Sequence, residues 1–324
     1  MQSYLQPDVL DAAGVRVFDS WAATFGRTHT ALELAPDGAS YRMKTRFARF
    51  QNAPELLGLY HQVADVRTAE DLGLPTPELA GGKAETVVVP PSDTLRRYVA
   101  ELADRAQAVQ TGQVEPDEDN MLKVTGDGRR AALDLRLVGE DPDPAGGKIA
   151  AAARRIAAIY EAARDRTYRD ARGQPAPRPG ALQLVFCDVS TPAADGWNAY
   201  DELRRELARR GVPTDALRYM QDAKTHQAKA SLFAACRDGQ VAVLIGSTET
   251  MGVGTNVQAR LVALHLDAPW RPADIEQRDG RGLRQGNQNP SIEIVRYVTE
   301  GSFDIYMCLV DRTTEGPPPA GRRG

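Results

Sequence analysis

The chain has 324 residues, of which 42% are hydrophobic, and a formal net charge of −4 from 40 basic and 44 acidic residues. This length and apolar content suffice for one large domain or two smaller ones. The slightly acidic balance excludes an overall basic field for nonspecific nucleic-acid binding, so any DNA contact follows a local track. No apolar run approaches the ~18 residues of a membrane span. The N-terminus also lacks a secretion signal, so we expect a cytoplasmic protein without a membrane partner.

The three cysteines and four histidines are scattered along the sequence without paired spacing. This distribution argues against a disulfide framework and against a zinc site. For each histidine, packing in the core or at the surface is the expected role. We therefore predict no metal site.

The first third of the sequence is predicted to be mainly helical with polar breaks. In the segment 52–66, apolar residues recur at helical spacing. The segment 41–50, "YRMKTRFARF", interleaves basic and aromatic residues, a pattern that occurs on nucleic-acid surfaces but more commonly marks a solvated helix face. We interpret it as a solvated helix face.

An α/β unit is predicted to begin after this helical part. The β-branched residues 87–89 predict a strand, and Ser92 or Asp93 is expected to cap the helix that follows. The acidic loop 114–120 is interpreted as solvated, because no apolar strand leads into it. Alanine and isoleucine then predict a helix within residues 142–164.

From residue 181 onward, apolar strand patterns alternate with helix patterns. The predicted strands are "ALQLVFCDVS", "VAVLIGST", "ARLVALHLDAPW" and "SIEIVRYVTEG". The predicted helices are "NAYDELRRELARRG", "HQAKASLFAACRDG" and "RPADIEQRDGRGLRQG". Such alternation predicts a parallel sheet with helices on both faces. Ligands of these sheets bind at the carboxyl ends of the strands, where the loop 246–258 and the segment after "DAPW" are expected.

Two of these segments contain residues suited to phosphate. The loop 246–258 has several hydroxyls and glycines, which can hold the phosphates of a nucleotide or of a DNA backbone, although tight turns also need glycine for steric reasons. If residues 272–285 are helical, Gln277, Arg281 and Arg284 project from one face. Two arginines on a helix face are usually solvated, but their planar forks also match phosphate oxygens.

The predicted helix 272–285 contains two glycines, which are unfavourable in a helix. Gly280 and Gly282 weaken a helix by ~1 kcal/mol each relative to alanine. We therefore expect the close approach of a ligand or of a facing domain at this point.

In this order and spacing, the segments resemble the second RecA-like lobe of superfamily-two helicases, most closely that of Swi/Snf-type DNA translocases. "LQLVFCDVS" is similar to motif IV of that family, "LIGSTETMGVGTNVQ" to motif V, and "DAPWRPADIEQRDGRGLRQGN" to the run that leads into motif VI. "LDAPWRPADIEQRDGR" and "YVTEGSFDIYM" are closer still to large plasmid- and phage-borne bacterial proteins that join a helicase to an adenine-methylase segment. The resemblance implies a RecA-like parallel α/β sheet, preceded by a mainly helical connector.

The same resemblance implies roles for particular residues. The residues implied to serve the ATP site are Arg281 and Arg284 at the γ-phosphate, Gln277 in support, and Gly252 and Gly254 between nucleotide and DNA. The residues implied to line the DNA track are Ser247, Thr248 and Asn256. ATP is expected to be shared with a first lobe that also holds Mg²⁺.

The sequence departs from the family in one important respect. No G-x-x-x-x-G-K-[ST] phosphate loop is present, because "ELAGGKAET" and "DPAGGKIAA" lack the first glycine and the hydroxyl after lysine. We therefore expect the chain to start after the first lobe and to act only with such a lobe, for example from a protein encoded upstream. The expected division is a connector at 1–105, a second lobe at 106–312 and a disordered tail at 313–324.

Two alternatives remain open at this stage. The chain can be a non-catalytic module that binds DNA or protein with the shape of a helicase lobe. A self-contained α/β enzyme that uses the loop 246–258 for a small nucleotide is less favoured, because no nucleophile or acid–base pair stands beside that loop.

Overall fold

The computed structural model describes residues 5–34, 41–65, 73, 75–170, 172–192, 196–251, 256–267 and 278–304. The chain divides into two compact units. The first unit comprises residues 1–74 and 108–121, and the second comprises residues 75–107 and 122–324. All segments with predicted site residues belong to the second unit. Within the described ranges, no helix is long and apolar enough to cross a membrane.

The first unit combines short helices with an antiparallel hairpin. Its elements are α1 (Pro7–Ala12), α2 (Phe18–Phe25), β1 (Gly26–Leu34), β2 (Tyr41–Phe50) and α3 (Ala53–His61). The pairing of β1 with β2 runs from Gly26 opposite Phe50 to Leu34 opposite Tyr41. Trp21 packs against the rings of Phe18, Phe25 and Phe50, and this aromatic cluster joins α2 to the end of the hairpin.

The interpretation of residues 41–50 as a helix face is wrong, since this segment is the strand β2. The sequence contains the reason: basic residues alternate with other residues at Arg42, Lys44 and Arg46, and a period of two is typical of a strand. The range 1–105, predicted to be mainly helical, also contains β3 (Glu78–Leu79) and β4 (Glu85–Val89), which pair with a strand of the second unit.

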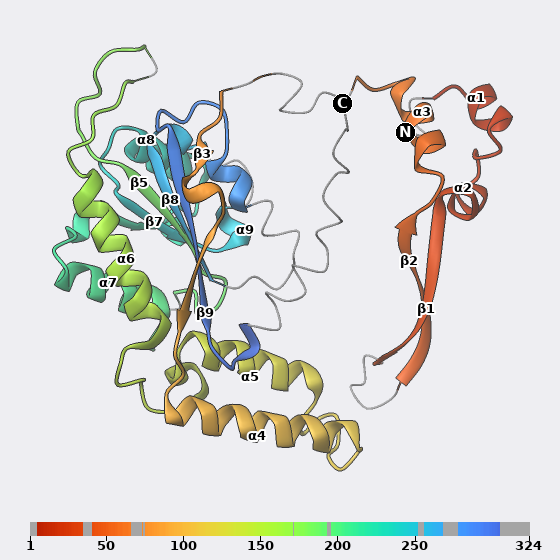
Figure 1. Cartoon of the computed structure of the whole chain (residues 1–324), viewed down its shortest axis with the longest axis horizontal. Coiled ribbons are helices and arrows are strands. Elements are labelled where there is room, and N and C mark those ends of the chain that lie inside the picture. The colour runs from red at the N-terminus through yellow and green to blue at the C-terminus, as the bar shows by residue number, and fades with distance from the viewer. Residues whose placement is uncertain are drawn as a thin grey trace. The chain divides into compact units, whose positions relative to one another are not determined.

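Seven parallel strands form the sheet of the second unit (Figure 1). Their order is β3, β9, β8, β5, β7, β6, and β4 also pairs with β9. The five strands after residue 180 are β5 (Leu182–Phe186), β6 (Leu217–Tyr219), β7 (Val243–Gly246), β8 (Leu261–Asp267) and β9 (Ser291–Thr299). Every pairing is parallel, so the predicted parallel α/β fold is confirmed.

Helices cover both faces of this sheet. The α-helices are α4 (Asp93–Gln110), α5 (Met121–Leu133), α6 (Gly147–Ala163), α7 (Ala199–Arg209), α8 (His226–Arg237) and α9 (Thr248–Met251). The short 3₁₀ turns are η1 (Ala80–Gly82), η2 (Leu135–Val138), η3 (Thr214–Ala216), η4 (Met220–Asp222) and η5 (Gln258–Arg260). Strand β5 shows the two-sided burial: Val185 packs in the core under α6 and α7, while Leu184 and Phe186 pack with Cys236 of α8 and Met251 of α9.

The helix ends follow from local hydrogen bonds. Ser92 Oγ accepts from the Leu95 N–H at the start of α4, which confirms the predicted cap. Thr225 Oγ1 accepts in the same way from the Ala228 N–H at the start of α8. Gly239 follows α8 with a φ of 78°, a conformation that favours glycine. These helix boundaries therefore have a local origin.

A polar ladder crosses the middle of the sheet. Nδ1 of His265 lies 2.9 Å from Tyr297 Oη, and its Nε2 lies 2.9 Å from Gln183 Oε1. Because the Gln183 amide nitrogen donates to the Ile156 carbonyl, Oε1 accepts, so Nε2 carries the proton. Burial, together with the charge of Arg155, lowers the pKa of His265 to about 3. The ladder therefore holds a neutral imidazole.

We predict that His265 makes the stability of the chain depend on pH. In the unfolded chain the imidazole titrates near pH ~6.5. Below pH ~6.5 the unfolded chain binds a proton at His265 that the folded chain does not bind. The contribution of His265 to the free energy of unfolding is therefore complete above that pH and is lost as the pH falls toward 3. Between pH 7 and pH 5 the free energy of unfolding should fall by ~2 kcal/mol from this group. Urea titrations at both pH values measure the difference.

The matched variants are His265→Gln and His226→Gln, since His226 is exposed. The first should lose this pH dependence and the second should keep it. An unchanged pH dependence in His265→Gln would contradict the assignment of a neutral, buried imidazole.

Candidate functional site at the carboxyl edge of the sheet

Three neighbouring strands end at one buried guanidinium, that of Arg278. Its Nη2 lies 2.5 Å from Asp188 Oδ2, just after β5. Its Nε donates to Thr248 Oγ1, just after β7, at 2.8 Å, and its Nη1 donates to the Asp267 carbonyl at the end of β8, at 2.9 Å. The carboxyl ends of β5, β7 and β8 are thus joined through one side chain.

The arginine of this contact is almost completely withdrawn from water, while the Asp188 side chain is partly exposed. The Arg278 side chain is 1% exposed, and its guanidinium lies over the Phe186 ring at 5.5 Å. Asp188 also accepts from the Thr248 backbone N–H at 2.6 Å and from the Thr248 hydroxyl at 2.9 Å. Because a buried charge is tolerated only when it is paired and hydrogen-bonded, these bonds account for Arg278 inside the protein.

The loop after β7 begins with a capped helical turn. The Ser247 carbonyl and hydroxyl interact with Thr250 at 3.1 Å, and the Ser247 side chain is buried at the start of α9. Thr248 is engaged by Asp188 and Arg278. Asn256 is exposed, and its carbonyl accepts from Arg237 at 3.2 Å. Ser247 and Thr248 therefore shape the loop from within.

The predicted arginines lie on the helical turn that begins at Arg278. Residues 278–282 are helical; Arg281 is partly buried and Arg284 is exposed. Among the described residues, neither guanidinium has an acidic partner, in contrast to Arg278. Burial lowers the pKa of Arg281, and the positive charge of nearby Arg284 lowers it further. Gln277 and the predicted Gly252 and Gly254 lie outside the described residues.

The two glycines of this turn have different surroundings. A Cβ on Gly282 would lie 2.3 Å from Ile292 Cδ1 and 3.1 Å from Leu264 Cδ1. The expectation that a ligand or a facing domain requires Gly282 is therefore wrong, because the core of the same unit fills that space. A Cβ on Gly280 would meet no described atom within 4 Å.

Sequence reasoning missed a second buried charge at this edge. Lys148, at the start of α6, is 3% exposed, and its Nζ lies 2.9 Å from Asp267 Oδ1 and 2.6 Å from Asp304 Oδ2. Burial alone would lower the pKa of Lys148, but the two carboxylates outweigh it and raise the pKa. No local pattern could have paired these residues, because Lys148 and Asp267 are 119 positions apart.

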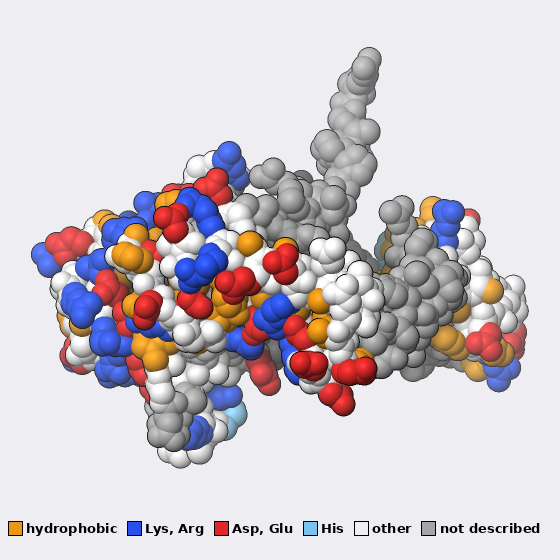
Figure 2. Space-filling model, turned by 90° about the horizontal axis from the view of Figure 1, so that it is seen from below, with side chains coloured by type: hydrophobic (Ala, Val, Ile, Leu, Met, Phe, Trp, Pro, Cys, Tyr) orange, Lys and Arg blue, Asp and Glu red, His pale blue; other side chains and the backbone are white. Residues whose placement is uncertain are grey.

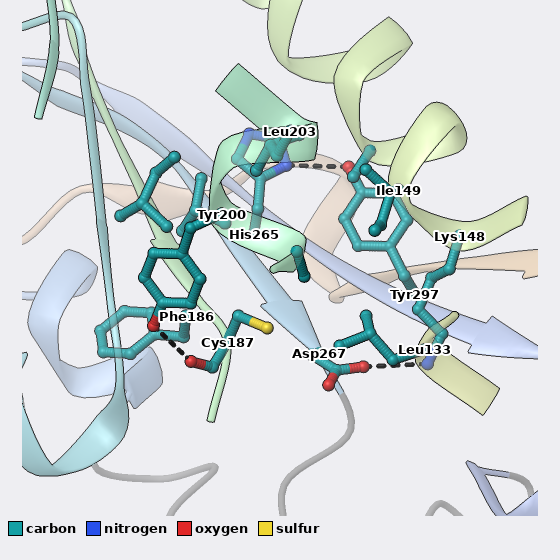
Figure 3. A pocket seen from close by; sticks show the side chains of 14 residues that line it. Leu133, Lys148, Ile149, Phe186, Cys187, Tyr200, Leu203, His265, Asp267 and Tyr297 are labelled. Atoms are coloured by element: carbon teal, nitrogen blue, oxygen red, sulfur yellow. Dashed lines mark hydrogen bonds and ion pairs between the residues drawn. The ribbon is translucent and has the colours of Figure 1, made fainter. Parts of the chain in front are cut away.

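A small cavity lies beside this ion pair, between α6, α7 and the sheet (Figure 3). Lys148 and Asp267 line one end, while Tyr200, whose hydroxyl donates to the Cys187 carbonyl at 2.6 Å, lines the other. Its volume of about 50 Å³ is far below the ~300 Å³ or more of a typical ligand pocket. Burial raises the pKa of the Cys187 thiol, which leaves it protonated. The cavity is therefore not the nucleotide site.

The visible surface carries both signs of charge. In Figure 2 the described Lys and Arg side chains are interspersed with Asp and Glu side chains. In the described ranges, no group of three His, Cys, Asp or Glu side chains could hold a metal ion. The functional contacts of this chain are therefore expected to be local.

Comparison with known families agrees with this arrangement. Residues 183–286, which contain both the Arg278 contact and the two unpaired arginines, match the family model described as helicase conserved C-terminal domain. This part of the chain is thus similar to helicase C-terminal domains. Residues 1–68 match a second model, described as probable helicase domain.

Individual relatives match only short parts of the chain. Defense against restriction protein B of Escherichia phage P1 is 37% identical over 71 residues, and the DNA repair protein RAD5 of Candida albicans is 34% identical over 73 residues. Each match covers 22% of this chain, but only 3% and 7% of the respective relative. The matched segments are thus small parts of much longer proteins.

Two solved structures have partial similarity. The C-terminal part of the Fun30 ATPase domain has a TM-score of 0.33 at 19% identity, over 40% of this chain and 39% of that one. Dbp5 of S. cerevisiae, bound to RNA and ADP BeF3, has a TM-score of 0.32 at 16% identity, over 41% of this chain and 32% of that one.

We predict opposite effects for alanine at the two glycines of the helical turn 278–282. Gly282→Ala should destabilise the protein by ~1 to 3 kcal/mol, because the added methyl group overlaps Ile292. Gly280→Ala is the matched control and should be neutral or stabilising by up to ~1 kcal/mol, since alanine favours helix and has free space there. Thermal and urea unfolding of the two variants measure the difference; equal stability would contradict the packing around Gly282.

Proposed function

We propose that the chain supplies the second motor lobe of an ATP-dependent DNA helicase or translocase. The observation that carries this proposal is the contrast between arginines of one segment. Arg278 is buried and fully paired, whereas Arg281 and Arg284 have no acidic partner among the described residues. Two neighbouring guanidiniums without an acidic partner in the described ranges are suited to a polyanion such as the phosphates of ATP.

In this proposal, Arg281 and Arg284 reach the γ-phosphate of ATP bound to a first lobe. Their charge stabilises the negative charge that develops on the equatorial oxygens during phosphoryl transfer. Gln277 supports them, and Gly252 and Gly254 allow the loop after β7 to lie against the nucleotide. These three assignments rest on the resemblance of the motifs to Swi/Snf-type translocases.

The first lobe supplies the phosphate loop and the Mg²⁺ ion. The sequence has no G-x-x-x-x-G-K-[ST] pattern, and the lysine of "DPAGGKIAA", Lys148, is engaged by Asp267 and Asp304. The first lobe is therefore assigned to sequence outside these residues or to a protein encoded upstream.

DNA is the proposed nucleic-acid partner, bound along the loop after β7. Asn256 is the exposed member of the three residues expected there and is assigned a direct contact. Ser247 and Thr248 have buried or shared hydroxyls, so their contribution is assigned to the loop's backbone amides and shape. A local track of this kind is compatible with the net charge of −4.

We predict that ATP hydrolysis requires both a phosphate-loop lobe and the two arginines. The full chain alone should show no DNA-stimulated ATPase activity, and activity should appear when the upstream-encoded lobe is added. Arg281→Ala and Arg284→Ala should each lower kcat ~1,000-fold or more, the loss typical of removing an arginine from a phosphoryl-transfer site. Phosphate release in the presence and absence of duplex DNA measures this activity.

The matched control is Arg209→Ala, which removes an arginine that is 68% exposed and pairs with Glu206 on α7. This variant should keep full activity. Hydrolysis by the chain alone would contradict the shared site. DNA binding that is steeply salt-dependent but indifferent to nucleotide, without hydrolysis in any mixture, would instead support a non-catalytic binding module.

A further inference from the structure

The turn that carries Arg281 is anchored to the sheet at three points. Arg278 joins it to the ends of β5, β7 and β8. Asp279 Oδ2 lies 2.9 Å from Arg296 Nη2 on β9. Gly282 packs directly on Leu264 and Ile292. Arg281 lies between these anchors, so the backbone that carries its side chain has little freedom.

Stability of the folded state alone does not require a buried ion pair at Arg278. A buried ion pair can often be replaced by apolar residues without loss of stability, because desolvation offsets much of the attraction. A guanidinium differs from an apolar group in that it has five donors in a rigid plane. Here that plane contacts Asp188, Thr248 and the Asp267 carbonyl at once, which fixes the orientation of the turn.

We propose that Asp188 and Arg278 are positioning residues for the phosphate-binding pair Arg281 and Arg284. This inference rests on the proposed function, because it assigns Asp188 and Arg278 a role that acts through those arginines. A donor that is already in place when charge develops on a phosphate needs no reorganisation, and small displacements are costly. Asp188, at the end of β5, therefore contributes to phosphate binding although it carries a negative charge.

That negative charge provides a sharp test. If Asp188 acted only through its charge, Asp188→Asn would strengthen the binding of a polyanion, because a repulsive group near the site would be removed. If Asp188 positions the arginines through Arg278, the same variant should weaken binding. The two explanations therefore predict opposite changes in the affinity for a polyanion when Asp188 is replaced by asparagine.

The probe is inorganic tripolyphosphate, whose affinity for the full chain is measured by calorimetry at fixed ionic strength. Arg281→Ala should weaken binding about tenfold, since a charge-assisted contact is lost. Asp188→Asn should weaken binding about fivefold in the wild-type background but less than about twofold in a background that carries both Arg281→Ala and Arg284→Ala, as expected for coupled residues. Asp93→Asn is the control, because the Asp93 side chain is 98% exposed on α4. This variant should bind tripolyphosphate with unchanged affinity.

A second variant separates positioning from folding. Arg278→Lys keeps the positive charge but loses the planar fork, so a fall in affinity cannot come from net charge. Arg278→Lys should weaken tripolyphosphate binding at a temperature where circular dichroism shows a folded chain. If Asp188→Asn does not fold, the affinity of Arg278→Lys tests the positioning role in its place.

The outcomes distinguish the two proposals. An affinity that Arg281→Ala leaves unchanged would overturn the proposed function. An effect of Arg281→Ala, combined with tighter binding by Asp188→Asn or with an equal loss in both backgrounds, would overturn the positioning role alone.

Discussion

The buried contact of Arg278 with Asp188, Thr248 and the Asp267 carbonyl is the interaction on which the candidate site depends. It fixes the carboxyl ends of three adjacent strands and the start of the helical turn that follows. Placing a guanidinium at 1% exposure is unfavourable unless every donor has an acceptor, so the surrounding segments are constrained to supply those acceptors. The position of the turn is therefore set by polar geometry as much as by apolar packing.

The same edge shows a division between paired and unpaired charges. Lys148 and Arg278 are buried and satisfied by carboxylates, and both contact Asp267. Arg281 and Arg284, a few residues further on, have no such partner in the described part of the chain. Paired cations hold the framework, and unpaired cations remain available for a ligand. This division, together with the helicase family match over residues 183–286, supports a role in binding phosphate.

Much of the fold could be predicted from the sequence, because buried parallel strands appear as short apolar runs between capped helices. The strand β4 was predicted from its β-branched residues, but its pairing and that of β3 with the distant strand β9 could not be. The hairpin of β1 and β2 was missed because the basic residues of β2 were interpreted as a helix face. The arginines of the site were found through their motif, but which arginine is buried could not be inferred. Arg278 and Arg281 differ only in contacts with residues such as Asp188, 90 positions away from Arg278. The role of Gly282 likewise depends on side chains from other strands.

The most direct measurement for the central claim is the affinity of this chain for a phosphate-loop lobe in different nucleotide states. ADP with fluoroaluminate, a mimic of the transferring phosphate, should tighten the association relative to ADP, because Arg281 and Arg284 then contact the mimic across the interface. The tightening should disappear in a chain with both arginines replaced by alanine. An association that is the same with either nucleotide, or that tightens equally without the arginines, would contradict the account.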